Sequence, residues 1–131
     1  MFNQSGIKTT VGAAPNQILF NTEFQLSVGV VVAQGSTTAD SEGRKIIKAG
    51  TPLTGSLDAR TTAFAEATTT EGVSNAVGVL LHDVDVTAGN ANGTLLIFGF
   101  VNTKMLDATT KTKITSAVKT ALNAKVTFIE A

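Results

Sequence analysis

The segment His82-Asp83-Val84-Asp85 places the single histidine of the chain beside two carboxylates, and these are residue types that do acid–base or metal chemistry. On a strand, successive side chains point to opposite faces, so Asp83 and Asp85 would share one face and His82 the other. The three groups would then not converge on one ion or substrate. The two carboxylates could hold a hard cation with additional loop oxygens, but the twelve-residue calcium-loop pattern is absent. A solvated strand face or a subunit contact is the simpler interpretation, and we expect no catalytic residue, no metal site and no cofactor.

Two polar segments with glycines resemble phosphate-binding loops at first sight. They are Asp40-Ser41-Glu42-Gly43 and Gly89-Asn90-Ala91-Asn92-Gly93. Neither has the glycine–lysine spacing of a phosphate-binding loop or lies between a strand and a helix. We therefore expect both segments to form turns.

The composition limits the classes of function. The chain has 131 residues, which is near the usual size of one domain, and it contains no Cys, Trp or Tyr. Thiol chemistry and cysteine-based metal sites are excluded, and aromatic platforms for sugars or bases have few candidate residues. With ten basic and ten acidic residues, the chain lacks the positive charge of a general nucleic-acid binder. This charge balance predicts no nucleic-acid partner. The apolar runs are all shorter than the roughly 20 residues of a membrane span, and no secretory signal is evident, so we expect no membrane partner either.

The charges are segregated along the chain. The region from Thr61 to Thr103 has four acidic residues and no basic one, whereas five of the ten basic residues follow it. Such segregation would make head-to-tail contacts between identical chains complementary. Simple solubility is the alternative, and the sequence leaves both open. The five basic residues are Lys104, Lys111, Lys113, Lys119 and Lys125.

The N-terminal residues are expected to form an extended arm. Residues 1–17 are rich in Asn, Gln, Thr, Gly and Ala and show no sustained helical or strand periodicity. We predict an arm over residues 1–20 and a single β-rich domain over 21–131. The arm is either a flexible tail or a segment that binds a partner. In the second case its apolar side chains would make the contact, namely Phe2, Ile7, Val11, Ile18 and Phe20.

Alternating apolar residues predict the first strands. Leu26, Val28, Val30 and Val32 recur with a period of two, which indicates a strand that ends at the polar loop 34–43. Residues 44–49 predict a short strand closed by Gly50 and Pro52. The Thr- and Ala-rich stretch 58–75 gives conflicting local signals, and we expect an irregular surface excursion there.

A hairpin and a C-terminal helix complete the predicted elements. The β-rich runs 76–87 and 93–102 flank a turn with Asn-Gly, which predicts an antiparallel hairpin in which Gly78 and Gly99 mark bulges or close backbone approach. Residues 110–123 predict one short amphipathic helix with Asn123 as a left-handed cap, and a final strand follows at Val126. The expected fold is therefore mainly β, a small β-barrel or sandwich-like domain with one short C-terminal α-helix and an extended N-terminal arm.

Three segments within residues 44–105 resemble the lambda-like head decoration proteins of tailed phages, which are small capsid-stabilising proteins. The resemblance covers about half of the chain: an Ala-Gly-Thr-Pro-Leu turn, a Val-Gly-Val-Leu strand and a later strand with a buried glycine. The motif residues are Gly50, Thr51, Pro52, Leu53, Gly78 and Gly99.

The resemblance implies a structural virion protein rather than an enzyme. It would be made in the host cytoplasm, bind the outer surface of an expanded capsid as a homotrimer, and order its N-terminal arm against the major capsid protein. The longer N-terminal portion and the C-terminal helix depart from the family pattern, which leaves open a head-fibre base or another capsid-surface protein. A glycan-binding module is a further alternative, against which the lack of Trp and Tyr counts. A hydrolase built on Asp83 and Asp85 is a third.

Overall fold

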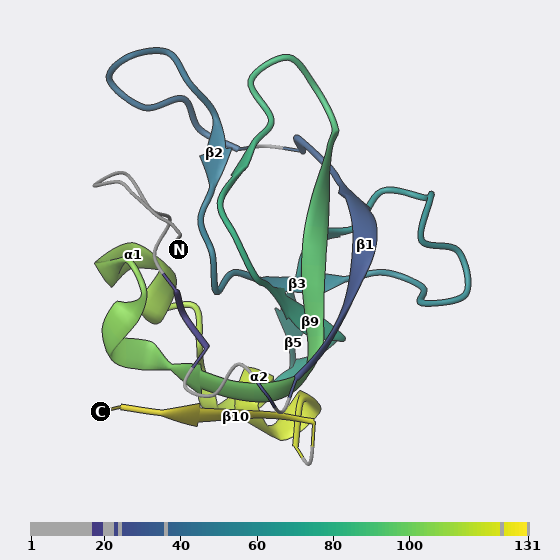
Figure 1. The fold of residues 1–131 in the computed structure, drawn as a ribbon, viewed down its shortest axis with the longest axis vertical. Helices are drawn as coiled ribbons and strands as arrows, with labels where there is room; N and C mark the ends of the chain where they lie inside the picture. Colours follow the sequence, from purple (N-terminus) through teal and green to yellow (C-terminus); the bar gives the residue numbers. More distant parts are fainter. Residues whose placement is uncertain (1–16, 20–22, 24, 36, 124, 131) are drawn as a thin grey trace, which may run out of the picture.

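One long strand organises the molecule (Figure 1). In the computed structural model, which describes residues 17–19, 23, 25–35, 37–123 and 125–130, β9 pairs antiparallel with β1 and β7 and parallel with β10. The main sheet continues from β7 through β3 to β4, while β2 pairs with β8 and β5 with β6. The strands are β1 (Leu26–Val32), β2 (Ile46–Ile47), β3 (Pro52–Thr54), β4 (Ala65–Glu66), β5 (Thr69–Thr70), β6 (Val73–Ser74), β7 (Gly78–Leu80), β8 (Val84–Asp85), β9 (Ala91–Asn102) and β10 (Val126–Ile129). The helices are the 3-10 helix η1 (Thr103–Met105), α1 (Ala108–Lys111) and α2 (Ser116–Ala121).

The mainly β fold is confirmed, with one difference in how the sheet ends. Phe64, just before β4, forms a bridge with Val32 of β1, so the two ends of the sheet approach one another. Over the described residues, however, the sheets do not close into a barrel. The bridge is a single one because the chain after Val32 turns away at Gln34, whose carbonyl accepts hydrogen bonds from the N–H and hydroxyl of Thr37.

The predicted β1 strand and the hairpin are confirmed. Val30 and Val32 are buried, as the period of two requires, and Val79 of β7 pairs antiparallel with Leu96 of β9. The end of the first predicted hairpin strand does not pair with β9. It forms β8, which pairs with β2 through Ile46 and Asp85.

The expectation of an irregular excursion over residues 58–75 is wrong from Ala65 onward. Three two-residue strands lie there, and β5 and β6 form a hairpin of their own. Phe64 in the same stretch is fully buried. An isolated aromatic residue carries no periodicity, so a pattern search passes over it although it fills the core.

The single helix predicted over residues 110–123 is instead two short helices. Thr115 interrupts the pattern because its hydroxyl accepts a hydrogen bond from the N–H of Val118 and so caps the start of α2. Asp107 caps α1 in the same way, through the N–H of Thr109. Asn123 does not have positive φ and is not a left-handed cap; Leu122 is the capping residue of α2.

Two apolar clusters make up the core. One joins β7, β9 and β10 to α2, with Leu96, Val101 and Leu122 fully buried. The other lies among the strands of the main sheet around Phe64, Leu53 and Leu95.

The domain begins earlier than the boundary predicted at residue 20. Ile18 is only 1% exposed and Leu19 only 9%, and both belong to the α2-side cluster. The N–H of Asn102 donates to the carbonyl of Ile18 at 2.7 Å, and Leu19 forms a bridge with Val101. The Ile18 side chain therefore serves the core of its own domain rather than a partner surface. The other proposed contact residues lie outside the described residues: Phe2, Ile7, Val11 and Phe20.

Candidate functional site

The acidic pair around His82 holds loops in place. Oδ1 of Asp83 accepts a hydrogen bond from the N–H of Ala49 at 2.7 Å, and its other oxygen lies 3.8 Å from the Nζ of Lys48. His82 is exposed at a bend just before β8. Asp83 thus ties the chain before β3 to the chain after β7.

Asp85 has a separate and equally local role. It accepts hydrogen bonds from both the hydroxyl and the N–H of Thr87, and these bonds hold the pKa of the Asp85 carboxyl below its usual value. The hydroxyl of Thr87 in turn accepts from the N–H of Lys45 at 2.8 Å. Asp85 therefore organises its own turn, whereas Asp83 joins two segments that are distant in sequence. Within the described part of the chain, no group of three or more His, Cys, Asp or Glu side chains could hold a metal ion.

The Gly50–Leu53 turn is a structural junction. Gly50 has a φ of 94°, and a Cβ there would lie 2.4 Å from Leu106, so only glycine fits. The N–H of Gly50 donates to Leu80, whose own N–H donates back to Thr51, and Pro52 starts β3. All the residues from Gly50 to Leu53 are buried, so none of them can contact a partner.

Gly78 is a second place where only glycine fits. A Cβ there would lie 2.5 Å from the carbonyl oxygen of Leu96 and 2.9 Å from the side chain of Leu95. The prediction of close backbone approach at Gly78 is therefore confirmed.

An irregularity in β9 sets the direction of its last side chains. Leu26 pairs with Phe98 but Ser27 pairs with Leu96, so Ile97 is an extra residue in the ladder. Gly99, two residues further on, is buried and pairs with Val126 at the start of β10. The irregularity leaves Gly99 and Val101 on the core face, so Phe98 and Phe100 point to the opposite face.

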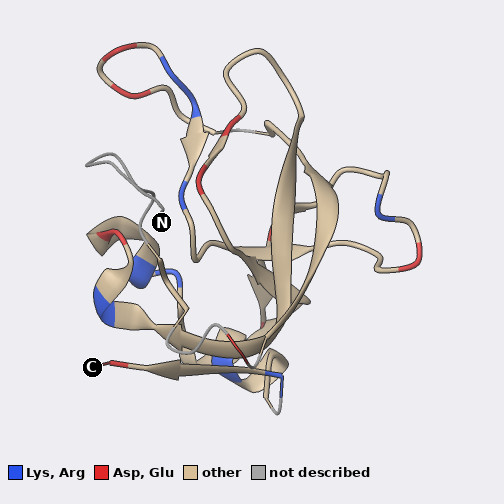
Figure 2. Cartoon of the chain, in the orientation of Figure 1, with Lys and Arg blue, Asp and Glu red and all other residues tan. Residues whose placement is uncertain are grey.

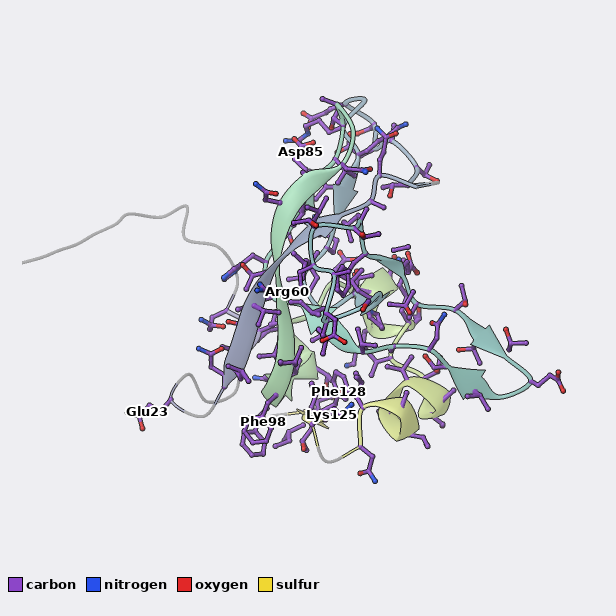
Figure 3. The ribbon with its side chains drawn as sticks, turned by 90° about the vertical axis from the view of Figure 1, so that its right-hand side faces the viewer. Glu23, Arg60, Asp85, Phe98, Lys125 and Phe128 are labelled. Atoms are coloured by element: carbon purple, nitrogen blue, oxygen red, sulfur yellow. The ribbon has the colours of Figure 1, made fainter. Side chains whose placement is uncertain are left out.

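That opposite face carries an exposed apolar row. Leu26 is 54% exposed, Phe98 45% and Ile129 36%. Ile129 pairs with Asn102 and so shares the face of Phe100 and Phe98, whereas Phe128 packs toward the core. Figure 3 shows Phe98 at the lower edge of the molecule, near Lys125, which precedes β10. We call Leu26, Phe98, Phe100 and Ile129 the outer apolar row.

The strands behind this row carry no charge. Neither β1 nor β9 contains a charged residue, and Figure 2 shows both as continuous uncharged ribbons. Some of the segregated charges pair within the chain instead. Lys113 lies 3.2 Å from Glu66 and Lys111 lies 2.7 Å from Glu130, so not all the basic residues are left for a second copy. These pairs are largely exposed and contribute little to stability.

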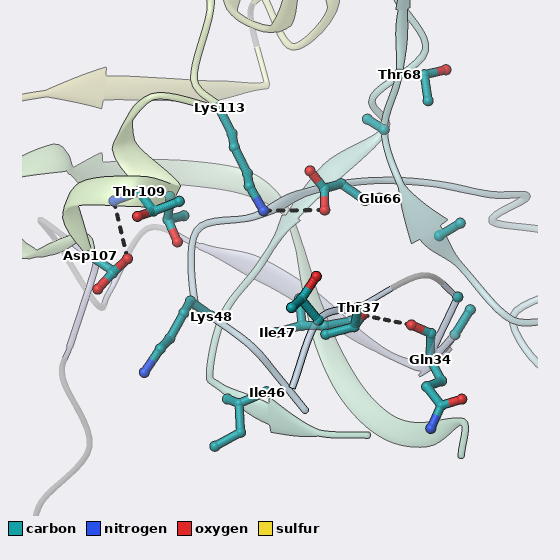
Figure 4. A pocket seen from close by; sticks show the side chains of 16 residues that line it. Gln34, Thr37, Ile46, Ile47, Lys48, Glu66, Thr68, Asp107, Thr109 and Lys113 are labelled. Carbon is teal, nitrogen blue, oxygen red and sulfur yellow. Dashed lines mark hydrogen bonds and ion pairs between the residues drawn. The ribbon is translucent and has the colours of Figure 1, made fainter. Parts of the chain in front are cut away.

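A groove lies on another side of the molecule, between β2, β4 and α1 (Figure 4). It has a volume of about 640 Å³. Ile46 and Ile47 line one wall, Ala65 and Glu66 the opposite wall, and Thr109 one end. Sequence reasoning missed the groove because its walls are three segments that only the β2–β8 and β3–β4 pairings bring together.

The described residues include no helix long and apolar enough to cross a membrane. Comparison of the whole chain with models of known protein families and with curated proteins found no match.

Proposed function

We propose that the chain is a structural virion protein that binds the outer surface of an expanded phage capsid as a trimer and stabilises the head. Three segments within residues 44–105 carry the resemblance to head decoration proteins. The turn of this motif, Gly50–Leu53, is wholly buried. Any family likeness therefore lies in the internal framework of the domain, and other surfaces must contact the capsid and the other copies.

The observation that carries the proposal is the outer apolar row. Large apolar side chains exposed together on neighbouring uncharged strands are typical of a surface that another protein covers. A cyclic assembly would bring the same row of each copy toward the symmetry axis. We therefore assign the row to the contact between copies and the N-terminal arm to the capsid.

The hydrogen bonds of the two candidate carboxylates also agree with a role in protein–protein contact rather than in catalysis. Asp83 accepts a hydrogen bond from the backbone N–H of Ala49, which joins two chain segments, and Asp85 accepts one from the N–H of Thr87 in its own turn. A protein that adds stability to a shell needs a rigid domain and complementary surfaces, and it needs no reactive group.

The test combines two measurements on the purified full chain. Sedimentation equilibrium gives its mass, and co-sedimentation with expanded, empty heads of the same phage gives its binding. We expect a trimer that pellets with the heads. A persistent monomer that stays in the supernatant would overturn the proposal.

A further inference from the structure

The groove between β2 and β4 exposes an unused strand edge on β4. The N–H of Ala67 donates to the carbonyl of Pro52, so the backbone groups of Glu66, one residue earlier, point away from β3. Phe64 has the same orientation, and its N–H and carbonyl both bond to the β1 side, at Val31 and Ala33. A parallel ladder with β1 thus starts at Phe64 and would continue at Glu66.

The ladder stops because the chain after β1 bonds to the segment between β8 and β9 instead. The side-chain amide of Gln34 donates to the carbonyls of Val86 and Thr87, and its N–H donates to Asn90. These bonds hold Gln34 against the β8–β9 turn. The N–H and carbonyl of Glu66 are left at the groove without a described backbone partner.

The opposite wall has a matching edge on β2. The N–H of Val86 donates to the carbonyl of Lys45, so the backbone groups of Ile46 point away from β8. The side chains of Ile46 and Ile47 are half-buried at this wall. A groove with two free strand edges, lined by isoleucine and alanine side chains together with threonine and other polar side chains, fits an extended peptide that adds as a strand.

The charge of the groove limits what that peptide can be. Its charged side chains are two lysines, Lys48 and Lys113, and two acids, Glu66 and Asp107. The positive and negative charges balance, and Lys113 pairs with Glu66 across the groove (Figure 4). A nearly uncharged segment with small and β-branched residues is the complementary occupant.

The first sixteen residues of this chain have that composition and lie within reach. Their single charged side chain is Lys8, and Ile7, Thr9 and Val11 would share one face of a strand. The described chain resumes at Gln17, and Ile18 is bonded to Asn102, five residues before Asp107 in the groove wall. Sixteen extended residues span about 50 Å, whereas a domain of this size is about 35 Å across. We propose that residues 1–16 dock in the groove of their own chain as an added strand around Ile7–Val11.

This inference does not rest on the capsid assignment, because its test uses the isolated full chain without any shell. Docking in the groove and binding to a capsid would be alternative placements of the same segment. The inference can fail while the capsid assignment holds, and the reverse is equally possible.

The first experiment is cross-linking, which the absence of cysteine makes specific. The double variant Thr9→Cys with Ala65→Cys places one thiol in the segment and one in the groove wall. The control, Thr9→Cys with Leu57→Cys, uses an exposed residue that does not line the groove. With a short bismaleimide at low protein concentration, we expect the intramolecular product to form about tenfold faster in the first variant. Equal rates would overturn the proposal, and so would linked dimers, which would show that a second copy supplies the segment.

The second experiment needs no new thiol. Hydrogen exchange is followed at the N–H groups of Ile46 and Glu66 in the native chain, in Thr9→Pro and in Thr9→Val. Proline removes a ladder donor, whereas valine keeps strand propensity. At the edge that the segment covers, we expect exchange about tenfold slower in the native chain and in Thr9→Val than in Thr9→Pro. Equal exchange at both N–H groups in all three proteins would overturn the proposal.

Discussion

Oδ1 of Asp83 accepts a hydrogen bond at 2.7 Å from the backbone N–H of Ala49, which lies 34 residues earlier in the chain. The bond closes the junction at which the Gly50–Leu53 turn enters the main sheet. One of the two carboxylates that a hydrolase would use is thus a long-range structural acceptor. Its contribution to stability can be measured directly.

Replacing Asp83 by Ala leaves the N–H of the buried Ala49 without its acceptor. We expect a loss of about 1 to 2 kcal/mol in the free energy of unfolding, measured by urea denaturation. Asp83→Asn keeps a side-chain oxygen and is expected to lose less than half as much. Asp58→Ala, in an exposed loop, is the control and should change stability by less than about 0.5 kcal/mol. Equal stability of Asp83→Ala and the native chain would contradict this role.

Gly78→Ala tests the close approach of β7 and β9. The added methyl would overlap the carbonyl oxygen of Leu96, a backbone atom that cannot move without disturbing the sheet. We expect a loss of about 2 to 3 kcal/mol in the free energy of unfolding. Gly29→Ala is the matched control, because a Cβ at that position in β1 meets nothing within 4 Å. Similar stabilities of the two variants would show that the sheet accommodates the methyl.

The sequence predicted those elements that carry their own periodicity. β1, the β7–β9 pairing and β10 follow from alternation and turn residues, which are local signals. The apolar spacing from Ile114 to Leu122 is helical and therefore predicts one helix. The break between the two helices depends on the hydroxyl of Thr115, which accepts a hydrogen bond from the N–H of Val118. Such side-chain capping competes with helix propensity, and spacing alone does not reveal it.

The candidate surfaces were less predictable than the strands. Ile18 was expected to contact a partner, but it completes the core because Asn102 fixes its backbone beside β9. The exposed position of Phe98 depends on one extra residue in β9, which reverses the alternation. The groove depends on Gln34 bonding to the β8–β9 turn rather than continuing the β1 ladder. Each outcome is decided by a single contact distant in sequence.

The turn between β5 and β6 offers a stabilising substitution. Glu71 has a φ of 50° and Gly72 a φ of 80°, the backbone of a two-residue hairpin turn that favours Asn-Gly. Glu71→Asn is expected to raise the free energy of unfolding by about 0.5 to 1 kcal/mol, because asparagine tolerates this conformation better. Glu71→Gln removes the charge but keeps the strain, so it should leave the Tm unchanged. A Tm no higher for Asn than for Gln would contradict the prediction.

Acid should destabilise the protein partly through Asp85. The hydroxyl of Thr87, and then its N–H, hold the pKa of the Asp85 carboxyl below its usual value in the folded state. A lowered folded pKa contributes stability above the unfolded pKa of about 3.9, and that contribution is lost as the pH falls through the folded value. Thr87→Val removes the hydroxyl, so the Tm of the variant should fall less than that of the native chain as the pH is lowered from about 5 through the folded pKa of Asp85. Parallel curves of Tm against pH would show that this bond does not set the titration.

The outer apolar row predicts which substitution breaks the assembly without unfolding the chain. Phe98 is 45% exposed and sits directly opposite Leu26, so an aspartate there would place a charge in the proposed contact between copies. A charge buried in an apolar interface without a partner is strongly unfavourable, and we expect Phe98→Asp to weaken self-association at least about tenfold. Val73→Asp is the matched control, because Val73 is 71% exposed on the β5–β6 hairpin and lies outside the row. Sedimentation equilibrium should show the native mass for Val73→Asp and a smaller mass for Phe98→Asp. The fold of the single chain should stay intact in both variants. Unchanged association of Phe98→Asp would show that the outer apolar row is not the contact between copies, and would favour the segregated charges as that contact.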